Sequence, residues 1–457
     1  MKVRAVILAG GEGTRLKVLT VKRAKPAVPF GGAYRIVDFT LSNCINSGLR
    51  QIYVLTQYKS YSLDKHLQRG WNVFSYEAGE FLYRIPPQHR VGQKWYEGTA
   101  DAVYQNIYLL ENRKPDHVLI LSGDHIYKMD YGALLHFHAG HDASMSLCAA
   151  VVPREGADQF GILEVDENWQ VVGFEEKPSD PKTIPGDPDH CLVNMGVYLV
   201  DTQCLVKELC HDARQSDSHH DFGKDIIPSK IADSTAIAYP FRNEDGDQAY
   251  WRDVGTLRAF WEANMELVSK SPQLNLYDRD WPIWTHQIQS PPAKFVWNEE
   301  GRRGEAIQSM VSGGCIVSGA HVEDSLLFSR VYVHSYSKVS ESVVLPDVDI
   351  GENCRIEKAI IDAGAKIAPG TEIGVDLDAD RERFRRHQRV IELSTRIDYG
   401  ALQEAALRVP GEPVGRESVD QRTGVMKSLA VPRIGKRLVA HAGSRDCLHV
   451  DRVAHPR

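Results

Sequence analysis

The sequence predicts an α/β domain with a mostly parallel sheet, followed by a parallel β-helix, and two rhythms in the chain carry this prediction. Up to about residue 270, short apolar runs alternate with helix-like segments, as in sheets that helices cover on both faces. Beyond residue 305, one aliphatic residue recurs at every sixth position. A chain of 457 residues has room for two or three domains.

Three strands and one helix are predicted within residues 1–270. Val3–Leu8 is a continuous apolar run that ends in glycines, and Gln51–Thr56 and His117–Ser122 have the same character of buried parallel strands. Thr99 is expected to cap a helix whose apolar residues recur at i, i+4 and i+7, namely Val103, Ile107 and Leu110. The alternative is a domain with strands and helices in separate layers.

Residues 271–305 contain several prolines and little periodicity, so they are expected to form a linker. The six-residue series then runs in four groups: Ile316, Val322 and Phe328; Val333, Val339 and Leu345; Val344, Ile350 and Ile356; Ile361, Ile367 and Ile373. One inward-pointing aliphatic residue per six suits a triangular coil, and the register slips between groups predict irregular coils over residues 306–397. A β-sandwich with short strands is the alternative.

Composition and charge exclude several classes of protein. The chain has 54 basic and 61 acidic residues, and a net charge of -7 disfavours a globally basic nucleic-acid binder. No apolar run approaches the roughly 20 residues of a membrane helix, and the start of the chain lacks a signal-peptide pattern. The eight scattered cysteines fit reduced thiols. We expect a cytoplasmic protein without nucleic-acid or membrane partners, ending in a flexible basic tail at residues 398–457.

A glycine-rich loop, Leu8-Ala9-Gly10-Gly11-Glu12-Gly13-Thr14-Arg15-Leu16, follows the first predicted strand. Its glycines let backbone N–H groups approach an anion, and Arg15 adds a planar fork for phosphate oxygens. Lys22, Arg23 and Lys25 also lie within the ten residues that follow Arg15. Because such cations repel one another unless an anion neutralises them, a polyphosphate ligand is expected. The alternative is a tight turn among solvated charges, since the loop matches neither the P-loop nor the dinucleotide motif.

Two carboxylates are candidates for Mg²⁺ ligands. Asp124 follows the strand predicted to end at Ser122, at the edge where open α/β sheets bind ligands. Asp253 likewise stands just before a glycine and a predicted helix start. Each of them alone is as well explained as a turn or helix-cap residue.

These residues resemble a known family. Leu8–Leu16 with Lys25-Pro26 resembles the signature of sugar-1-phosphate nucleotidyltransferases, and further motifs are similar to bacterial ADP-glucose pyrophosphorylases up to about Ile397. Those motifs are Lys22–Val28, Phe30–Gly32, Leu41–Gly48, Trp95–Val103, Gly123–Tyr127, Phe174–Pro178 and Trp251–Thr256.

The resemblance implies a Rossmann-like nucleotidyltransferase domain and a left-handed β-helix of hexapeptide repeats. It implies that ATP and α-D-glucose 1-phosphate give ADP-glucose and pyrophosphate for glycogen synthesis, with Mg²⁺ as cofactor. It also implies a homotetramer that responds to a glycolytic intermediate.

The resemblance also implies roles for individual residues. Arg15 and Lys25 would stabilise the triphosphate, and Asp124 with Asp253 would hold Mg²⁺. Nucleotide-binding residues would be Leu8, Ala9, Gly10, Gly11, Gly13, Thr14, Gly98 and Thr99. Glucose 1-phosphate would contact Tyr96, Gly161, Glu176, Lys177 and Asn194, and an effector would contact Lys22, Arg23 and Arg35.

The chain departs from the family pattern at three places. Asn194 stands where serine is usual, His89 replaces a glutamine in a loop near the adenine, and the tail after residue 398 does not match. Three alternative functions remain open at this point: a nucleotidyltransferase for another sugar or base, an acyltransferase that uses His321 or His334, and a silent regulatory subunit.

Overall fold

A computed structural model describes residues 1–88, 95–111, 114–233, 235–243, 246–376, 378, 380, 385–387 and 390–393. By contacts the chain divides into a unit of residues 1–396 and a unit of residues 397–457. The expected basic tail and His89 lie outside the described residues.

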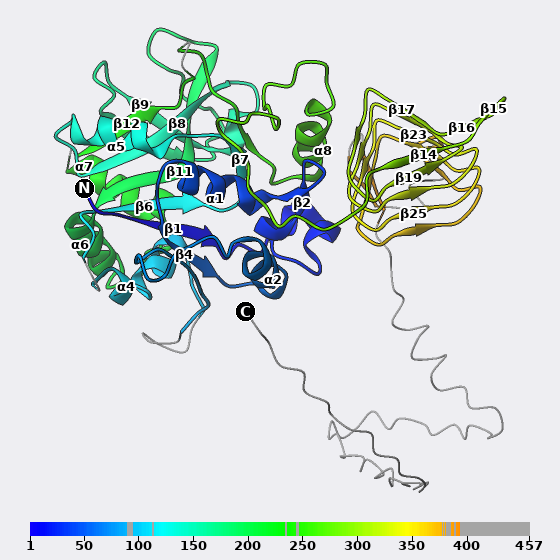
Figure 1. Cartoon of the computed structure of the whole chain (residues 1–457). Coiled ribbons are helices and arrows are strands. Elements are labelled where there is room, and N and C mark those ends of the chain that lie inside the picture. Colours follow the sequence, from blue (N-terminus) through cyan, green and yellow to red (C-terminus); the bar gives the residue numbers. More distant parts are fainter. Residues whose placement is uncertain are drawn as a thin grey trace, which may run out of the picture. The chain divides into compact units, whose positions relative to one another are not determined.

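The first part of the chain is an α/β domain around one nine-stranded mixed sheet (Figure 1). β1 (Val3–Ala9) lies between β4 (Gln51–Thr56) and β6 (His117–Ser122), and both pair with it in parallel. β5 (Phe81–Ile85) extends the parallel part beyond β4. On the other side β11 (His190–Asp201) runs antiparallel to β6. The predicted α/β fold is confirmed, and β4 and β6 have the predicted ends.

The remaining strands of this sheet extend it beyond β11. β8 (Met145–Pro153) and β9 (Gly161–Val165) both pair antiparallel with β11. β12 (Ala236–Pro240) is parallel to β8, and β10 (Val171–Glu176) is antiparallel to β9.

Helices cover both faces of the sheet. Consecutive side chains of a strand point to opposite faces, so the apolar strands have two apolar faces for helices to cover. Ala5 and Ile7 of β1 belong to an apolar cluster with α1 (Ile36–Asn46), α2 (Tyr61–Gly70) and α5 (Tyr131–Ala139). Val6 belongs to a second cluster, with α3 (Thr99–Tyr104), α6 (Thr202–Asp212) and α7 (Ile227–Ala232). Separate layers of strands and helices are therefore excluded.

The helix predicted after residue 99 differs from the prediction in two respects. It is interrupted between α3 and α4 (Tyr108–Glu111): of the three predicted apolar positions, Val103 lies in α3, Ile107 in the turn between the helices and Leu110 in α4. Thr99 is the first helical residue and the N-cap is Gly98, which makes no side-chain cap. The prediction of Thr99 as the cap was wrong, because a carbonyl distant in sequence accepts the first N–H groups of the helix. His220 O accepts Ala100 N–H at 2.8 Å and Asp101 N–H at 3.2 Å.

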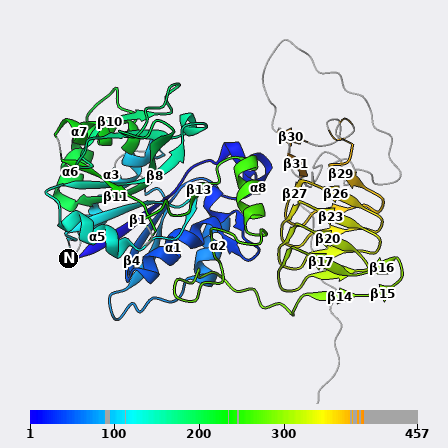
Figure 2. The same ribbon diagram turned by 90° about the horizontal axis from the view of Figure 1, so that it is seen from above.

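Short strands of the second part form three sheets whose rungs stack along one axis (Figure 2), and all their pairings are parallel except that of β30 with β31, which confirms the predicted β-helix. The first sheet contains β14 (Lys294–Val296), β19 (Ile316–Ser318), β22 (Tyr332–Val333), β25 (Asp349–Ile350) and β28 (Lys366–Ile367). The second contains β17 (Glu305–Ile307), β20 (His321–Glu323), β23 (Lys338–Ser340), β26 (Arg355–Glu357) and β29 (Glu372–Ile373). The third contains β18 (Met310–Val311), β21 (Leu326–Leu327), β24 (Val343–Val344), β27 (Ala359–Ile361), β31 (Val390–Leu393) and β30 (Arg385–His387).

The register slips in the sequence have a structural cause. Val333 pairs with Ile350, and Val339 pairs with Ile356, so the coil advances by 17 residues rather than by three full hexapeptides. Phe328 and Leu345 were expected to point into the β-helix, but they belong to an apolar cluster with Leu257 and Phe260 of α8 (Leu257–Glu266). An earlier coil is shorter still, since Ile316 pairs with Tyr332, 16 residues further on. These coils are therefore one or two residues short of three hexapeptides, and Phe328 and Leu345 face the α/β domain.

Residues 267–293, most of the expected linker, contain no helix or strand but are bound along α1 by side-chain hydrogen bonds. Asn46 Nδ2 donates to Pro282 O at 2.9 Å, and Thr285 Oγ1 donates to Asp38 Oδ2 at 2.6 Å. The first coil already begins with β14, inside the range 271–305. Two short hairpins lie outside these sheets: β2 (Pro29–Phe30) with β3 (Tyr34–Arg35), and β15 (Asn298–Glu299) with β16 (Arg302–Arg303). A separate antiparallel pair joins two distant segments, β7 (His125–Tyr127) and β13 (Trp251–Asp253).

Two further expectations concern cysteines and membranes. The seven cysteines that the structure describes are free, and Cys447 lies outside that part of the chain. Within the described ranges, every helix is too short or too polar to cross a membrane.

Candidate active site

A cleft of about 610 Å³ opens at the carboxyl ends of β1 and β6. The residues from the glycine-rich loop are Leu8, Ala9, Gly10, Gly11, Gly13, Thr14 and Arg15. Lys25, Tyr96, Gly98, Thr99, Asp124, Glu176 and Asn194 also line it. The predicted nucleotide-binding residues and most of the predicted catalytic and sugar-phosphate residues therefore come together in one cavity.

The loop after β1 requires a glycine at one position in particular. Gly13 has φ +64° and forms the N-terminal cap of a 3₁₀ helix, Thr14–Thr20. A Cβ at this position would lie 3.0 Å from Lys25 Cβ and 3.1 Å from Thr20 Cγ2. Glycine therefore allows the loop to turn tightly and brings Arg15 and Lys25 to the same end of the cleft.

Two short strands bring the distant carboxylates together. β7 begins directly after Asp124, and it pairs antiparallel with β13, where Asp253 stands opposite His125. Lys25 Nζ donates to Asp124 Oδ2 at 2.8 Å and to Asp253 Oδ1 at 2.9 Å. Ser122 Oγ also donates to Asp124 Oδ1, and Arg15 Nη2 lies 3.5 Å from Asp253 Oδ2.

The charges in this cluster stabilise one another strongly. Burial alone would lower the pKa of Lys25, but the Asp124 and Asp253 carboxylates outweigh it and raise that pKa above its ordinary value. Burial would likewise raise the pKa of both aspartates, yet the Lys25 ammonium holds them below their usual range. Two anionic oxygens therefore converge on one buried ammonium group at the wall of the cleft, where Asp124 stays partly exposed.

The sugar-phosphate residues lie around the end of β10. Gly161 of β9 pairs with Glu176, and a Cβ on that glycine would come within 2.9 Å of Glu176 Oε2. Lys177 lies outside the main cleft, in an open pocket that shares Glu176 with it, and its Nζ donates to Glu176 Oε1 at 2.6 Å. Tyr96 lines the cleft from the opposite side, and its hydroxyl accepts a hydrogen bond from Asn106 Nδ2 at 2.9 Å.

Asn194, the departure from the family pattern, is held at an irregularity in β11. The pairing of β11 with β8 shifts register between Asn194 and Tyr198, and Gly196 in between has φ +67°. Asn194 Nδ2 donates to Tyr198 Oη at 2.8 Å, and Asn194 Oδ1 accepts Gly196 N–H at 3.0 Å. The longer side chain is thus fixed by its own hydrogen bonds at the cleft wall.

Several residues that line the cleft were missed by the sequence analysis. They include Gln57, Tyr58, Glu97, Ser122, Tyr198, Asp221 and Phe222. Asp221 caps the helical turn Phe222–Ile226 and accepts a hydrogen bond from Thr99 Oγ1 at 2.8 Å. The signal for Asp221 was weak, because an aspartate before a phenylalanine and a glycine marks only a turn.

The loop before Asp221 fixes the position of Gly98. A Cβ on Gly98 would lie 2.1 Å from His220 O, so only glycine permits this close approach. His220 Nδ1 lies 2.8 Å from Asp212 Oδ2, and the hydrogen bond to Asp212 raises the pKa of His220 above its ordinary value. His220 therefore carries its charge to a higher pH than a free histidine.

This His220–Asp212 pair predicts a pH dependence of stability. A raised folded pKa gives stability that is fully present below the unfolded pKa of about 6.5 and is lost as the pH rises through the folded pKa. We expect urea unfolding to show a loss of about 1 kcal/mol or less between about pH 6 and pH 9. Asp212→Asn should abolish most of this loss, and an unchanged loss in that variant would mean that other groups cause it.

The three residues expected to bind an effector lie outside the cleft. Arg23 Nη2 pairs with Asp362 Oδ1 of the β-helix at 3.1 Å, and Lys22 is exposed. Arg35 is half-buried, donates to Ala27 O and lies at the N-terminus of α1; burial lowers its pKa. The Arg23 charge also contributes to lowering the pKa of Arg35, so these two arginines lie near each other, although Arg23 is engaged by Asp362.

The two histidines of the acyltransferase alternative also lie outside the cleft. His321 Nδ1 lies 2.9 Å from Glu305 Oε1, and His334 Nε2 lies 2.9 Å from Asp349 Oδ1. Each has a carboxylate of the neighbouring coil as its partner, which is the arrangement of a surface ion pair.

Comparison with known proteins gives matches along most of the chain. A model of nucleotidyl transferases matches residues 4–270, and a model of GlmU-like C-terminal hexapeptide domains matches residues 291–393. A glucose-1-phosphate adenylyltransferase of Alteromonas mediterranea is 53% identical over 413 residues, which cover 90% of this chain and 93% of the relative. A glucose-1-phosphate adenylyltransferase 2 of Pseudoalteromonas atlantica is 57% identical over 394 residues, 86% of this chain and 94% of the relative. The glucose-1-phosphate adenylyltransferase of Methylococcus capsulatus is 54% identical over 381 residues, 83% of this chain and 90% of the relative.

Proposed function

Because the chain belongs to the nucleotidyl transferases and, among them, to the glucose-1-phosphate adenylyltransferases, we propose that its cleft makes ADP-glucose for glycogen synthesis. The substrates are ATP and α-D-glucose 1-phosphate, and the second product is pyrophosphate. The observation that supports this most strongly is the Lys25 ammonium between Asp124 and Asp253, next to a glycine-rich loop. Such a site binds cations and polyphosphate at the same point.

The reaction needs positioning and charge neutralisation rather than a protein nucleophile. A phosphate oxygen of glucose 1-phosphate forms a bond to the α-phosphorus of ATP, and the bond from that phosphorus to the pyrophosphate oxygen breaks. Pyrophosphate leaves with the electron pair, so no proton has to move in this step. Arg15 and Lys25 stabilise the charge that develops on the leaving group.

The residues present fit a Mg²⁺ ion. Asp124 and Asp253 converge within hydrogen-bond distance of one ammonium group, which shows that the two carboxylates are arranged to face a single cation. Carboxylate oxygens with phosphate oxygens are the ligands that Mg²⁺ prefers. Asp124 and Asp253 would hold the ion, which supplies charge neutralisation on the reacting phosphates when bound. Lys25 then contributes its charge from the same side.

The two substrates take different parts of the cleft. The nucleotide lies along Leu8, Ala9, Gly10, Gly11, Gly13, Thr14, Gly98 and Thr99. Glucose 1-phosphate lies toward Tyr96, Gly161, Glu176, Lys177 and Asn194. Glu176 accepts hydrogen bonds from sugar hydroxyls, and Lys177 neutralises the sugar phosphate after its ion pair with Glu176 opens.

Lys177→Gln should raise the KM for glucose 1-phosphate about 10-fold, because a charge-assisted hydrogen bond from an exposed lysine is worth about 1.5 kcal/mol. The KM for ATP should change little, since Lys177 lies on the sugar side. Steady-state kinetics with each substrate varied in turn measures both constants. Lys182→Gln is a matched control, because Lys182 pairs with Glu164 on the same surface but outside the cleft. Equal changes of both KM values would remove Lys177 from the sugar-phosphate site.

Assembly and regulation extend the proposal. We keep the expected division into an α/β domain of residues 1–270, a linker from 271, a β-helix to 397 and a basic tail at 398–457, but the β-helix starts at β14 (Lys294–Val296) rather than at residue 306. The enzyme is a cytoplasmic homotetramer, and a glycolytic intermediate acts through Lys22, Arg23 and Arg35. Arg23 supports this role, because its ion pair with Asp362 joins the α/β domain to the β-helix.

The test of the proposed function is pyrophosphate release from each nucleoside triphosphate with glucose 1-phosphate, with and without glycolytic intermediates. We expect ATP to be preferred and at least one intermediate to change the rate. Faster release from UTP or dTTP would instead indicate synthesis of another nucleotide sugar. Sedimentation of the same protein measures the assembly state, and a monomer at working concentration would contradict the tetramer.

A further inference from the structure

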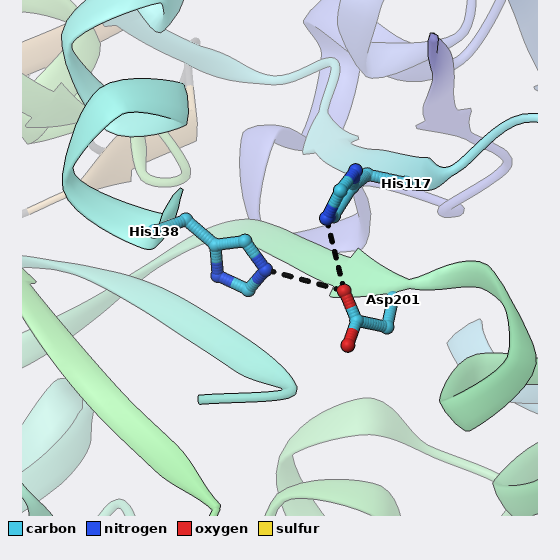
Figure 3. A group of neighbouring side chains, drawn as sticks. All are labelled: His117, His138 and Asp201. Atoms are coloured by element: carbon cyan, nitrogen blue, oxygen red, sulfur yellow. Dashed lines mark hydrogen bonds and ion pairs between the residues drawn. The ribbon is translucent and has the colours of Figure 1, made fainter. Parts of the chain in front are cut away.

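Three side chains with metal-ligand atoms converge at the sheet edge opposite the cleft (Figure 3). His117 begins β6, Asp201 ends β11, and the antiparallel register places these two residues directly opposite each other. His138 reaches them from the last turn of α5. Ser122, where β6 meets the cleft, is five residues from His117, or about 16 Å along the strand. This cluster is therefore separate from the Asp124–Asp253 site.

The spacing of the ligand atoms matches a coordination shell. Asp201 Oδ1 lies 3.0 Å from His117 Nε2 and 3.4 Å from His138 Nε2. The ligand atoms of the three residues all lie within 4.8 Å of one another. A tetrahedral Zn²⁺ with bonds of about 2.0–2.2 Å separates its ligand atoms by about 3.3–3.5 Å. Small rotations of these side chains would open the centre for an ion.

The Asp201 carboxylate points toward the two imidazoles and does not cap the helix that follows it. Asp201 is the N-cap residue of α6, yet its side chain makes no cap hydrogen bond. Aspartate is a preferred N-cap because its oxygen accepts a helix N–H. Here Oδ1 faces both histidines, and the Asp201 side chain is 43% exposed, which gives an ion a path from solvent.

The histidines have the surroundings of metal ligands. The His138 side chain is only 3% exposed, and its Nε2 faces Asp201 Oδ1. His138 Nδ1 lies 2.8 Å from Ser146 Oγ, a contact that fixes the ring with Nε2 toward Asp201. His117 faces Asp201 with Nε2, and this nitrogen is the ligand atom that the His117 ring offers.

We propose that His117, His138 and Asp201 bind a divalent transition-metal ion of the Zn²⁺ class, with water as the fourth ligand. Two imidazole nitrogens and one carboxylate oxygen suit Zn²⁺ better than Mg²⁺, which prefers oxygen ligands alone. The ion ties β6, β11 and α5 together at the edge away from the reaction. The ion stabilises the structure and takes no part in the synthesis of ADP-glucose.

The experiment uses the full chain, freed of metals with a chelator and kept in excess Mg²⁺ to occupy oxygen-ligand sites. Zn²⁺ is titrated in competition with a chromophoric chelator. We expect wild type to bind one more Zn²⁺ per chain than Asp201→Asn, or to bind it more than about 10-fold tighter. Zn²⁺ should also raise the Tm of wild type but not of Asp201→Asn.

His136→Asn is the matched control. His136 lies on the same helix, is exposed, and its Nδ1 contacts Gly132 O, so its loss should leave Zn²⁺ binding and the Tm shift unchanged. His117→Gln serves as a second site variant if Asp201→Asn is poorly folded. Wild type that binds no Zn²⁺, or that binds it as Asp201→Asn and His117→Gln do, would overturn the proposal. The cluster would then be a hydrogen-bonded network in which both imidazoles donate to Asp201.

Discussion

Asp124→Asn should lower kcat by about 10²–10³-fold or more, because an amide cannot replace an anionic metal ligand at the reacting phosphates. Asp124 faces Lys25 and lines the cleft, so the loss falls on the chemical step. The fold should survive, since aspartate and asparagine have nearly the same shape. Steady-state turnover at saturating ATP, glucose 1-phosphate and Mg²⁺ measures the effect, and the far-UV circular dichroism of the variant checks the fold.

Asp180→Asn is the matched control for this change. Asp180 also pairs with a basic residue, Arg154, but its side chain is 84% exposed and it lies outside the cleft. Its loss should leave kcat within about twofold of wild type, because exposed ion pairs contribute little. Turnover close to wild type in Asp124→Asn would exclude Asp124 from metal binding.

Lys25→Gln should impair both turnover and stability. Removing a cation that stabilises the leaving pyrophosphate should cost about 10²–10³ in kcat. It also leaves the Asp253 carboxylate, 14% exposed, and the Asp124 carboxylate, 31% exposed, facing each other without the Lys25 ammonium. Breaking a fully buried ion pair lowers the free energy of unfolding by about 3–5 kcal/mol, and the partial exposure of Asp124 places this loss at about 3 kcal/mol or less. Lys128→Gln, which loses a single pair with Asp278 outside the cleft, is the control.

The stability loss in Lys25→Gln should depend on pH with a definite sign. In wild type the pKa of each aspartate is lowered, so their stabilisation is present above the unfolded pKa of about 3.9 and is lost as the pH falls through the folded values. In the variant, burial raises these pKa values, and stability is lost as the pH rises above about 4. In denaturant unfolding without Mg²⁺, the difference in free energy of unfolding between wild type and Lys25→Gln should therefore increase from about pH 4 to pH 7. If this difference stayed constant over that pH range, the coupling of Lys25 to the two carboxylates would be contradicted.

The sequence predicted those parts of the fold that depend on local conformation or on a regular repeat of apolar residues. β4 and β6 were predicted with their observed ends, because a parallel strand buried on both faces reads as a continuous apolar run. The β-helix was predicted because its inward positions recur in register over several coils. The glycine-rich loop could be assigned since Gly13 serves a tight turn that few residues can adopt.

The parts that sequence could not provide depend on pairings between distant segments. Asp124 and Asp253 meet only because β7 pairs with β13, and nothing local to either strand encodes that pairing. Thr99 was wrongly predicted as a helix cap, because the carbonyl of His220 binds the N–H groups that a cap would have bound. Phe328 and Leu345 were expected inside the β-helix, but α8 offers an apolar surface to them from outside. The apolar character of a residue predicts that it is buried, but it does not predict which neighbouring element it packs against.

The most direct test of the central claim is the mass of the products that purified protein forms from ATP and glucose 1-phosphate. We expect ADP-glucose and pyrophosphate in equal amounts when Mg²⁺ is present, and neither when a chelator has removed the ion. ADP-glucose formation that is unaffected by chelation would contradict the proposed role of Asp124 and Asp253. A complete absence of ADP-glucose with ATP, Mg²⁺ and glycolytic intermediates all present would contradict the proposed function itself.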